Sequence, residues 1–411
     1  MQSSLLWYET FTKHLMKLGF TLNHYDPCVA NRMINGHQCT IAWYVDDTMI
    51  SHKDPKVVSW IINQIENIFG KMTVKRGAQH TFIGMDFELT KDKKVKITMK
   101  EYIKECIEAF GEEIKGSAKT PAKHNLFEHS QKEASTPLDD GKAEKFHHIV
   151  AKLLYVSKRA RLDIDLPITY LCSKVMKPDH GDWEKLRRVL TYLNGTLDLP
   201  RIIGADNLDS LYSWVDASYA THADMRGHTG GLMSFGRGAV HHKCSKQKLN
   251  TKSSTESEIV GASDYIPWVI WLKHFLKQQG KELKTNTFFQ DNESAIKLGK
   301  NGRKSSRDKT RHITIRYFFI TDVLKRENID MRHCPTTRML ADFYTKPLQG
   351  TLFVNMRNAI MGLCPMPIEE RVENNVKKQN DVSKPNKDNS WNKIQNKQTY
   401  ADIVRGKTIK Q

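Results

Sequence analysis

The order of strands and helices after about residue 210 is the feature that most restricts the fold of this chain. Three short strands joined by glycine-containing turns are predicted first, in "SLYSWVDASY", "GGLMSFG" and "GAVHHKCS". Helices then alternate with strands, beginning with a long helix from "TKSSTESEIV" to "WLKHFLKQQG" that Pro267 is expected to bend. A strand meander followed by alternating helices and strands predicts a mixed five-stranded sheet with helices on both faces.

Four carboxylates occupy positions in this region where solvation would not place them. Asp216 lies inside the apolar strand "WVDAS", and Asp291 ends the strand "TFFQD". Glu258 lies in the first turn of the long helix, and Asp342 lies in a short predicted helix, "TRMLADFYTK". If these elements converge, the carboxylates face one another, which is tolerable only when they share cations. Two divalent ions about 3.5–4 Å apart would make the site a phosphodiester hydrolase.

Each of these residues also has a purely structural interpretation. Thr255 and Glu258 match a capping box, so Glu258 could simply cap its helix. Asp291 could be the N-cap of the next helix, and Asp342 could be an ordinary surface residue. The catalytic hypothesis therefore depends on the whole set in this order of elements.

A second acidic feature is the adjacent pair Asp46 and Asp47 in the apolar run "TIAWYVDDTMI". Adjacent carboxylates inside a strand are costly without a counter-ion, so a tight turn between two strands is expected here. The turn could hold a divalent cation, or it could be an exposed hairpin without one.

The overall charge favours a polyanionic partner. Lys and Arg total 64 against 46 Asp and Glu, which gives a net charge of +18. Nucleic acid is the first candidate and an anionic membrane surface is its competitor, although no apolar run approaches the roughly 18 residues that span a bilayer. The seven cysteines are scattered without CxxC spacing. We therefore expect an intracellular protein without structural zinc, and we interpret His241, His242 and Cys244 as strand residues.

Two groups of basic residues flank the acidic positions. They either form a solvated charged face or hold the backbone of a nucleic acid beside the acidic centre, and we favour the second interpretation. The resemblance described below implies that this nucleic acid is an RNA–DNA hybrid. His312 either helps product release or contacts the substrate, or it is a surface histidine in a basic loop, which is the interpretation we favour. The first group is Lys243, Lys246, Lys248 and Lys252; the second is Arg303, Lys304, Arg307, Lys309 and Arg311.

The rest of the chain divides by composition. Helices are predicted over 4–19, 56–70 and 100–111, with a hairpin over 39–52 and two strands in "FIGMDFEL" and "KKVKITM". A polar stretch over 112–142 suggests a linker, and 143–194 is helical. After about 366 the chain is rich in Asn, Lys and Gln, which predicts disorder.

The block "WVDASYATHADMRGHTGGLMSF…SSTESEIVGAS…FFQDNESAIKLGKN…LADFYTKPL" resembles the ribonuclease H domain of copia-type retrotransposon Pol polyproteins. "WYVDDTMI", "FIGMDFEL" and "YIKECIEAFG" resemble their reverse transcriptase, and "WEKLRRVLTYLNGT" resembles their connecting segment. The resemblance covers about residues 2–350. It implies a partial reverse transcriptase palm and thumb (1–118), a connection (119–209), a ribonuclease H-like domain (210–348) and a mostly disordered C-terminal extension (349–411).

The resemblance also implies an activity. Asp216, Glu258, Asp291 and Asp342 would bind two Mg²⁺ or Mn²⁺ ions and hydrolyse the RNA strand of an RNA–DNA hybrid. Asp46 and Asp47 would be a polymerase remnant, since the earlier palm strand with the third aspartate is not in this sequence, so we expect negligible DNA synthesis. Met1 resembles an internal methionine of a longer polyprotein.

The expected partners and location follow from the same resemblance. RNA–DNA hybrids and single-stranded nucleic acid are the expected ligands, a membrane is not, and a full-length polymerase or other retrotransposon proteins could be partners. A cytoplasmic particle and the nucleus both remain open as locations. The alternative is a catalytically silent relic that binds nucleic acid through its charge.

Overall fold

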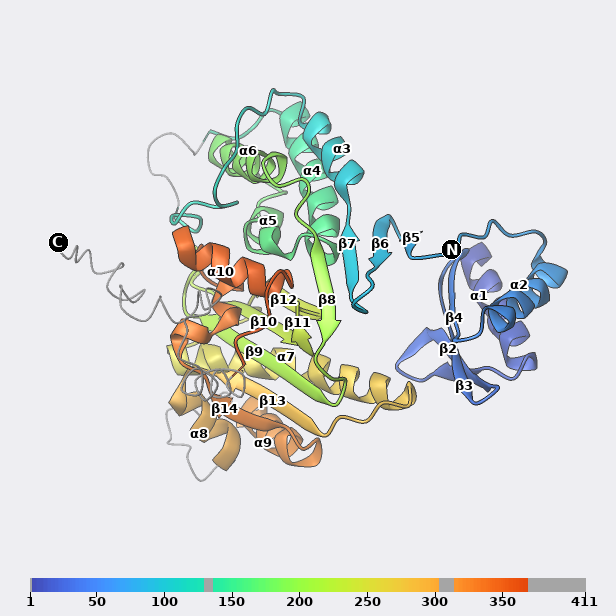
Figure 1. Ribbon diagram of the computed structural model, residues 1–411. Helices are drawn as coiled ribbons and strands as arrows, with labels where there is room; N and C mark the ends of the chain where they lie inside the picture. Colours follow the sequence, from blue (N-terminus) through green and yellow to red (C-terminus); the bar gives the residue numbers. More distant parts are fainter. Residues whose placement is uncertain (1, 129–135, 303–313, 369–411) are drawn as a thin grey trace, which may run out of the picture.

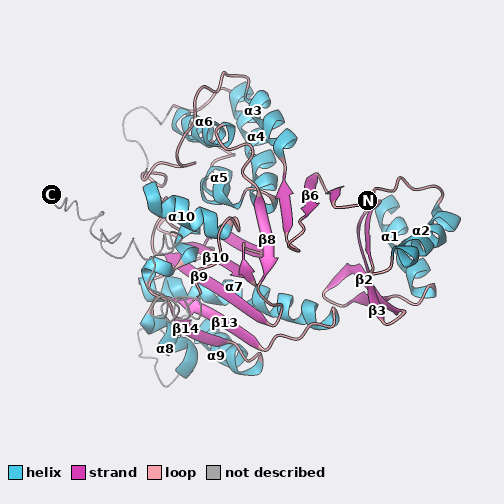
Figure 2. Ribbon diagram, viewed as in Figure 1, coloured by secondary structure: helices cyan, strands magenta, loops and turns pink. Residues whose placement is uncertain are grey.

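The computed structural model describes residues 2–128, 136–302 and 314–368 (Figure 1). These parts form ten α-helices and three β-sheets, which confirms the predicted α+β class (Figure 2). An N-terminal lobe, residues 2–69, lies to one side and is joined to the rest of the molecule by residues 70–78 (Figure 1). Within these described parts, no helix is both long enough and apolar enough to cross a membrane.

The N-terminal lobe is a four-stranded antiparallel meander with two helices and a core of its own. Phe11, Ile41, Trp43 and Ile61 are buried in this core. Strands β3 and β4 form the hairpin that the sequence predicts around Asp46 and Asp47. The elements are α1 (Gln2–Lys17), β1 (Thr21–Asn23), β2 (Asp26–Ile34), β3 (His37–Tyr44), β4 (Asp47–Ser51) and α2 (Pro55–Phe69).

The second sheet combines strands from distant parts of the sequence. Its order is β11-β8-β7-β6-β5, and neighbouring strands are antiparallel. Strands from the three segments that the sequence analysis treats separately, 1–118, 119–209 and 210–348, therefore form one sheet. Its strands are β5 (Gln79–Phe82), β6 (Met85–Leu89), β7 (Val95–Thr98), β8 (Arg201–Ala205) and β11 (Gly236–Arg237).

A helical layer shares one hydrophobic core with this sheet and with the third one. Figure 1 shows its helices α3, α4 and α6 at the top of the molecule. Phe146, Leu153, Trp183 and Leu190 are buried in its core, at the helical spacing that the sequence predicts. Helix α10 belongs to the same core through Phe353, although it lies in the segment expected to be an extension. The helices are α3 (Lys100–Phe110), α4 (Asp140–Arg159), the 3₁₀ turn η1 (Leu162–Ile164), α5 (Asp165–Cys172), α6 (His180–Asn194) and α10 (Gly350–Ile360).

The third sheet has five strands in the order β12-β10-β9-β13-β14. Strands β12, β10 and β9 are antiparallel, whereas β9, β13 and β14 are parallel, so the sheet is mixed as predicted. The central strand is β9. The strands are β12 (His241–Lys246), β10 (His228–Ser234), β9 (Ser210–Ser218), β13 (Thr285–Gln290) and β14 (Asp330–His333).

Both faces of this sheet are covered, by different parts of the chain. Val215 and Phe288 pack in a core with α7 (Ser254–Gln278), α8 (Glu293–Asn301) and α9 (Thr314–Arg326). Their neighbours Trp214 and Phe289 belong to the core shared with α4, α5 and α6, because alternate residues of a strand point to opposite faces. The helical layer thus covers the second face of the sheet.

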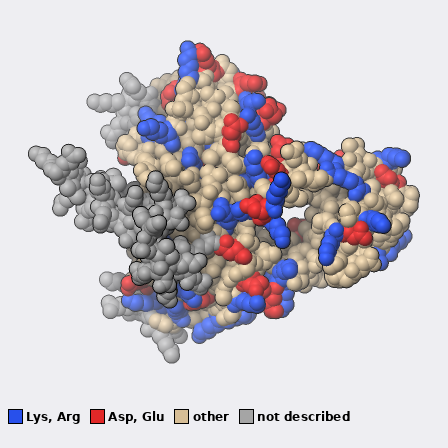
Figure 3. Space-filling model, viewed as in Figure 1, with Lys and Arg blue, Asp and Glu red and all other residues tan. Residues whose placement is uncertain are grey.

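Helix α7 also holds the N-terminal lobe. It continues through Pro267 to Gln278, so its last turns extend beyond the sheet toward the lobe (Figure 1). There the Trp271 indole donates a hydrogen bond to the Tyr25 carbonyl oxygen at 2.8 Å, and His274 stacks on the Tyr25 ring. Figure 3 shows an opening between the lobe and the rest of the molecule, bordered by Lys and Arg side chains.

Candidate metal centre

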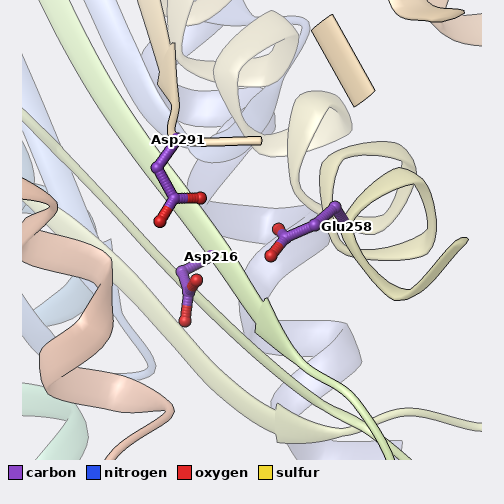
Figure 4. A group of neighbouring side chains, drawn as sticks. All are labelled: Asp216, Glu258 and Asp291. Carbon is purple, nitrogen blue, oxygen red and sulfur yellow. The ribbon is translucent and has the colours of Figure 1, made fainter. Parts of the chain in front are cut away.

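Three of the predicted carboxylates meet at one edge of the third sheet. Asp216 comes from β9, Glu258 from the start of α7, and Asp291 follows β13 directly. Their side chains point toward one another (Figure 4), and one ligand oxygen from each lies within 4.8 Å of the others. Asp216 and Glu258 are buried and Asp291 is half-buried. Carboxylates do not gather this closely in a protein interior without a compensating cation or proton.

The topology of the sheet explains this convergence. Strands β9 and β13 are adjacent and parallel, so their carboxyl ends reach the same edge. Helix α7 begins at that edge and packs along β9 and β10. The side chain of Glu258 therefore reaches the end of β9, where its Oε2 accepts a 3.0 Å hydrogen bond from the backbone N–H of Ala217.

The capping interpretations of Glu258 and Asp291 are wrong. Helix α7 is capped by Ser253, which accepts a hydrogen bond from the N–H of Glu256, while the Glu256 carboxylate accepts one from the N–H of Lys252 at 2.7 Å. Helix α8 is capped by Asn292. Because each helix uses a neighbouring residue as its cap, Glu258 and Asp291 are left to face the cluster.

Electrostatics in the cluster favour the neutral form of the acids. Burial, together with the charges of Asp216 and Asp291, raises the pKa of Glu258 well above its ordinary value. Burial and the Asp216 charge likewise raise the pKa of Asp291. The metal-free folded protein therefore holds protons at this centre more tightly than the unfolded chain does.

Gln290 holds Glu258 in place. Its side-chain oxygen accepts hydrogen bonds from the backbone N–H groups of Asp291 at 2.8 Å and Asn292 at 3.0 Å. These bonds direct its amide nitrogen toward Glu258, where it donates to Oε2 at 3.1 Å. Since Ala217 and Gln290 both bond Oε2, the other carboxylate oxygen, Oε1, is available to a ligand.

Asp342 lies beside the three other carboxylates and is linked to them through a lysine. It is buried in η5 (Leu340–Tyr344), a 3₁₀ turn that follows η4 (Thr336–Arg338) in place of the expected short helix. Lys346 Nζ lies 2.7 Å from Asp342 Oδ1 and 3.8 Å from Asp216 Oδ1. Burial and the Asp216 charge raise the pKa of Asp342 well above its ordinary value.

Carboxylate oxygens are the ligands that Mg²⁺ and Mn²⁺ prefer. The centre offers these oxygens in a buried position and carries excess negative charge, which a divalent cation would neutralise. The residues present therefore fit one such ion on Asp216, Glu258 and Asp291. Asp342 lies nearby and is paired with Lys346.

Four of the basic residues predicted to bind nucleic acid lie in the described parts of the chain. Lys243 donates to the backbone oxygen of Asp264 at 3.0 Å, and Lys246 forms a 2.7 Å ion pair with Asp224. Lys248 and Lys252 are exposed. Six further candidates lie outside the described residues: Arg303, Lys304, Arg307, Lys309, Arg311 and His312.

The Asp46–Asp47 turn is exposed in the N-terminal lobe. Within the parts of the chain that the structure describes, Asp46 and Asp47 belong to no group of three potential metal ligands. The backbone at Val45, which precedes them, has a φ of 53°, an unfavourable conformation for a β-branched residue.

The strand residues His242 and Cys244 have buried partners. His242 Nε2 lies 2.9 Å from Asp165 Oδ2, and His228 Nε2 lies 3.1 Å from Cys244 Sγ. Asp165 belongs to the helical layer, so the His242 contact joins that layer to the sheet, whereas the His228–Cys244 contact links strands β10 and β12 within the sheet.

Sequence reasoning missed Gln290, Thr345 and Lys346 as members of the centre. The Thr345 hydroxyl donates a hydrogen bond to Asp216 Oδ2. Their position was the available signal, since Gln290 precedes Asp291 directly and Lys346 follows Asp342 by four residues.

Comparisons with known proteins agree on the origin of the chain. It is 28% identical to the "Retrovirus-related Pol polyprotein from transposon TNT 1-94" of Nicotiana tabacum, over 86% of this chain and 26% of that protein. It is 26% identical to the Pol polyprotein from transposon RE1 of Arabidopsis thaliana, over 89% of this chain and 24% of that protein.

A third relative is more distant. The Gag-Pol polyprotein of transposon Ty1-DR1 from Saccharomyces cerevisiae is 22% identical, over 87% of this chain and 21% of that protein. The homologues of the present chain are thus retrotransposon Pol polyproteins, which supports the derivation of this chain from a retroelement. The chain spans about a quarter of the length of these relatives. No family model and no solved structure matches it.

Proposed function

We propose that this chain is a ribonuclease H-type endonuclease derived from a retrotransposon Pol polyprotein, and that it hydrolyses the RNA strand of RNA–DNA hybrids. The observation that carries the proposal is the convergence of Asp216, Glu258 and Asp291 within 4.8 Å of one another. This arrangement raises the pKa values of Glu258 and Asp291. Carboxylates with raised pKa values are typical of functional sites, whereas a purely structural role does not require them to be so close.

The residues have separate roles in this proposal. Asp216, Glu258 and Asp291 would hold a divalent ion, which would activate water and neutralise phosphate charge as a Lewis acid. Ala217 and Gln290 orient the Glu258 carboxylate, and Thr345 orients that of Asp216. Hydrolysis of this class leaves a 3′-hydroxyl on the upstream product.

The substrate class rests on charge and on the homologues. A net charge of +18 favours a polyanion. Lys248 and Lys252 are exposed in the segment that enters α7, which begins at the carboxylates, so they can contact a nucleic-acid backbone there. Single-stranded nucleic acid and other retrotransposon proteins are further proposed partners. DNA synthesis by this chain alone is not part of the proposal, because Asp46 and Asp47 have no third ligand among the described residues.

The test is hydrolysis of a labelled RNA–DNA hybrid by the purified chain in Mg²⁺ or Mn²⁺. We expect cleavage of the RNA strand by the wild type and a loss of at least about 100-fold in Asp216→Asn, as for removal of a group that stabilises transition-state charge. Asp322→Asn is the matched control, because Asp322 is an exposed residue paired with Arg326 on α9.

The alternative is a silent relic that binds nucleic acid through charge alone. It predicts salt-sensitive binding of the hybrid without cleavage in either metal. Equal cleavage by the wild type and Asp216→Asn would also refute the proposal, since it would indicate a contaminating nuclease.

A further inference from the structure

A positively charged side chain lies among the carboxylates. The ammonium group of Lys346 lies between two of them, 2.7 Å from Asp342 Oδ1 and 3.8 Å from Asp216 Oδ1. Asp216 is therefore shared, since it also belongs to the group formed with Glu258 and Asp291. The lysine links the fourth carboxylate to the other three.

The charge of Lys346 is secure. Burial lowers the pKa of its ammonium, but the carboxylates of Asp216 and Asp342 outweigh burial, and the net pKa is raised. The distances of 2.7 Å to Asp342 Oδ1 and 3.8 Å to Asp216 Oδ1 are those of ion pairs. Like a bound metal ion, the ammonium neutralises two neighbouring carboxylates.

The backbone next to Lys346 is held by hydrogen bonds, whereas its side chain is partly exposed. The Lys346 N–H donates to the Asp342 carbonyl oxygen at 2.9 Å, and the Thr345 hydroxyl bonds Asp216. The Lys346 side chain is 21% exposed, so solvent reaches part of it. A lysine has a flexible four-carbon stem, which allows its ammonium to leave the carboxylates without disturbing the chain.

Building on the proposed nuclease, we propose that Lys346 is the resident cation of this centre and stands in for a second divalent ion. One divalent ion binds tightly to Asp216, Glu258 and Asp291, while the ammonium occupies the position between Asp216 and Asp342. A second ion binds there only after Lys346 has moved away, for example toward a substrate phosphate. Lys346 is thus a positioning residue that sets the number of bound ions.

The test is Mn²⁺ binding to the full chain, measured by calorimetry without substrate at neutral pH. We expect one tight site in the wild type and in Lys346→Arg, which keeps the charge. Lys346→Met should bind two ions, or bind the first at least about tenfold more tightly, because a positive charge next to the site has been removed.

Lys104→Met is the matched control. Lys104 is ion-paired with Glu101 on its own helix, α3, and its removal changes the net charge by the same amount. It should bind Mn²⁺ like the wild type. If Lys346→Met does not fold, Lys346→Gln provides the same measurement.

The outcomes separate this inference from the proposed function. Wild-type chain that binds one ion and cleaves hybrids, with identical Mn²⁺ binding by Lys346→Met, would overturn the role of Lys346 alone. Two equally tight sites in the wild type would overturn it too. A wild type that binds no Mn²⁺ would overturn the metal centre and both proposals.

Discussion

Neutralising Glu258 should stabilise the metal-free protein and destabilise it when metal is present. Glu258→Gln keeps the size of the side chain and an oxygen that can accept from Ala217 and Gln290. It removes one negative charge from a group whose ligand atoms lie within 4.8 Å. The substitution therefore changes charge with little change in packing.

The magnitude follows from the spacing of the charges. Two unit charges at 4.8 Å, the upper limit of the spacing between the ligand atoms, repel by about 3.5 kcal/mol at an effective dielectric constant of about 20. Lys346 offsets part of this repulsion, so we expect a gain of about 2 kcal/mol in the free energy of unfolding. For a chain of 411 residues that gain corresponds to a rise of about 2–3 °C in Tm.

The effect should depend on pH in a defined direction. The pKa of Glu258 is raised in the folded state, so the wild type is most stable, relative to the variant, below the ordinary Glu pKa of about 4.3. It loses that stability as pH rises through the folded pKa. The advantage of Glu258→Gln should be near zero at about pH 4 and largest at about pH 8.

Bound metal should make the wild type more stable than Glu258→Gln. An ion at about 100 times its Kd stabilises the wild type by about 2.7 kcal/mol, and the variant has lost a ligand. The assay is thermal unfolding at several pH values, with chelator and with Mn²⁺.

Glu256→Gln is the matched control. Glu256 is equally buried, lies on the same helix and caps it through the N–H of Lys252. This variant should lose about 0.5–1 kcal/mol both with and without metal. The reasoning is refuted if Glu258→Gln is less stable than the wild type in chelator at pH 8, or if Mn²⁺ leaves the order unchanged.

Three further changes test other parts of the structure. Gln290→Leu leaves the N–H groups of Asp291 and Asn292 without their acceptor and should cost about 1–3 kcal/mol in thermal unfolding, with weaker Mn²⁺ binding; unchanged binding would contradict its role in orienting Glu258. Asp165→Asn breaks a buried group that pairs with Lys158 and His242 and should cost about 3–5 kcal/mol in urea unfolding. The lowered pKa of Asp165, in which these two partners outweigh burial, means that the wild type should lose this stability as pH falls below about 4, whereas Asp165→Asn should show no such loss. Val45→Gly relieves a positive φ and should stabilise the N-terminal lobe by about 1 kcal/mol, as measured by hydrogen exchange, whereas a loss of protection would show that the turn is not strained.

The sequence by itself determined the local structure and the identity of the acidic residues. The short apolar run in "SLYSWVDAS" matches β9, a strand that is buried on both faces, and helical spacing in "WEKLRRVLTYLN" matches α6, because burial of one helix face imposes that period. An aspartate inside an apolar strand and another at a strand end indicated Asp216 and Asp291, since an unpaired charge there is costly.

Only the tertiary structure decided which groups meet. Local patterns could not decide whether Glu258 caps its helix or faces the other carboxylates, because Thr255 and Glu258 match a capping box, and the choice depends on which glutamate faces the end of β9. They also gave no reason to place Lys346 between Asp216 and Asp342, or helix α10 in the core beside the helical layer. The contacts that bring different elements together join residues far apart in the chain, 41 positions between Ala217 and Glu258 and 130 between Asp216 and Lys346. The pairing of such residues is set by packing of the whole chain rather than by local spacing.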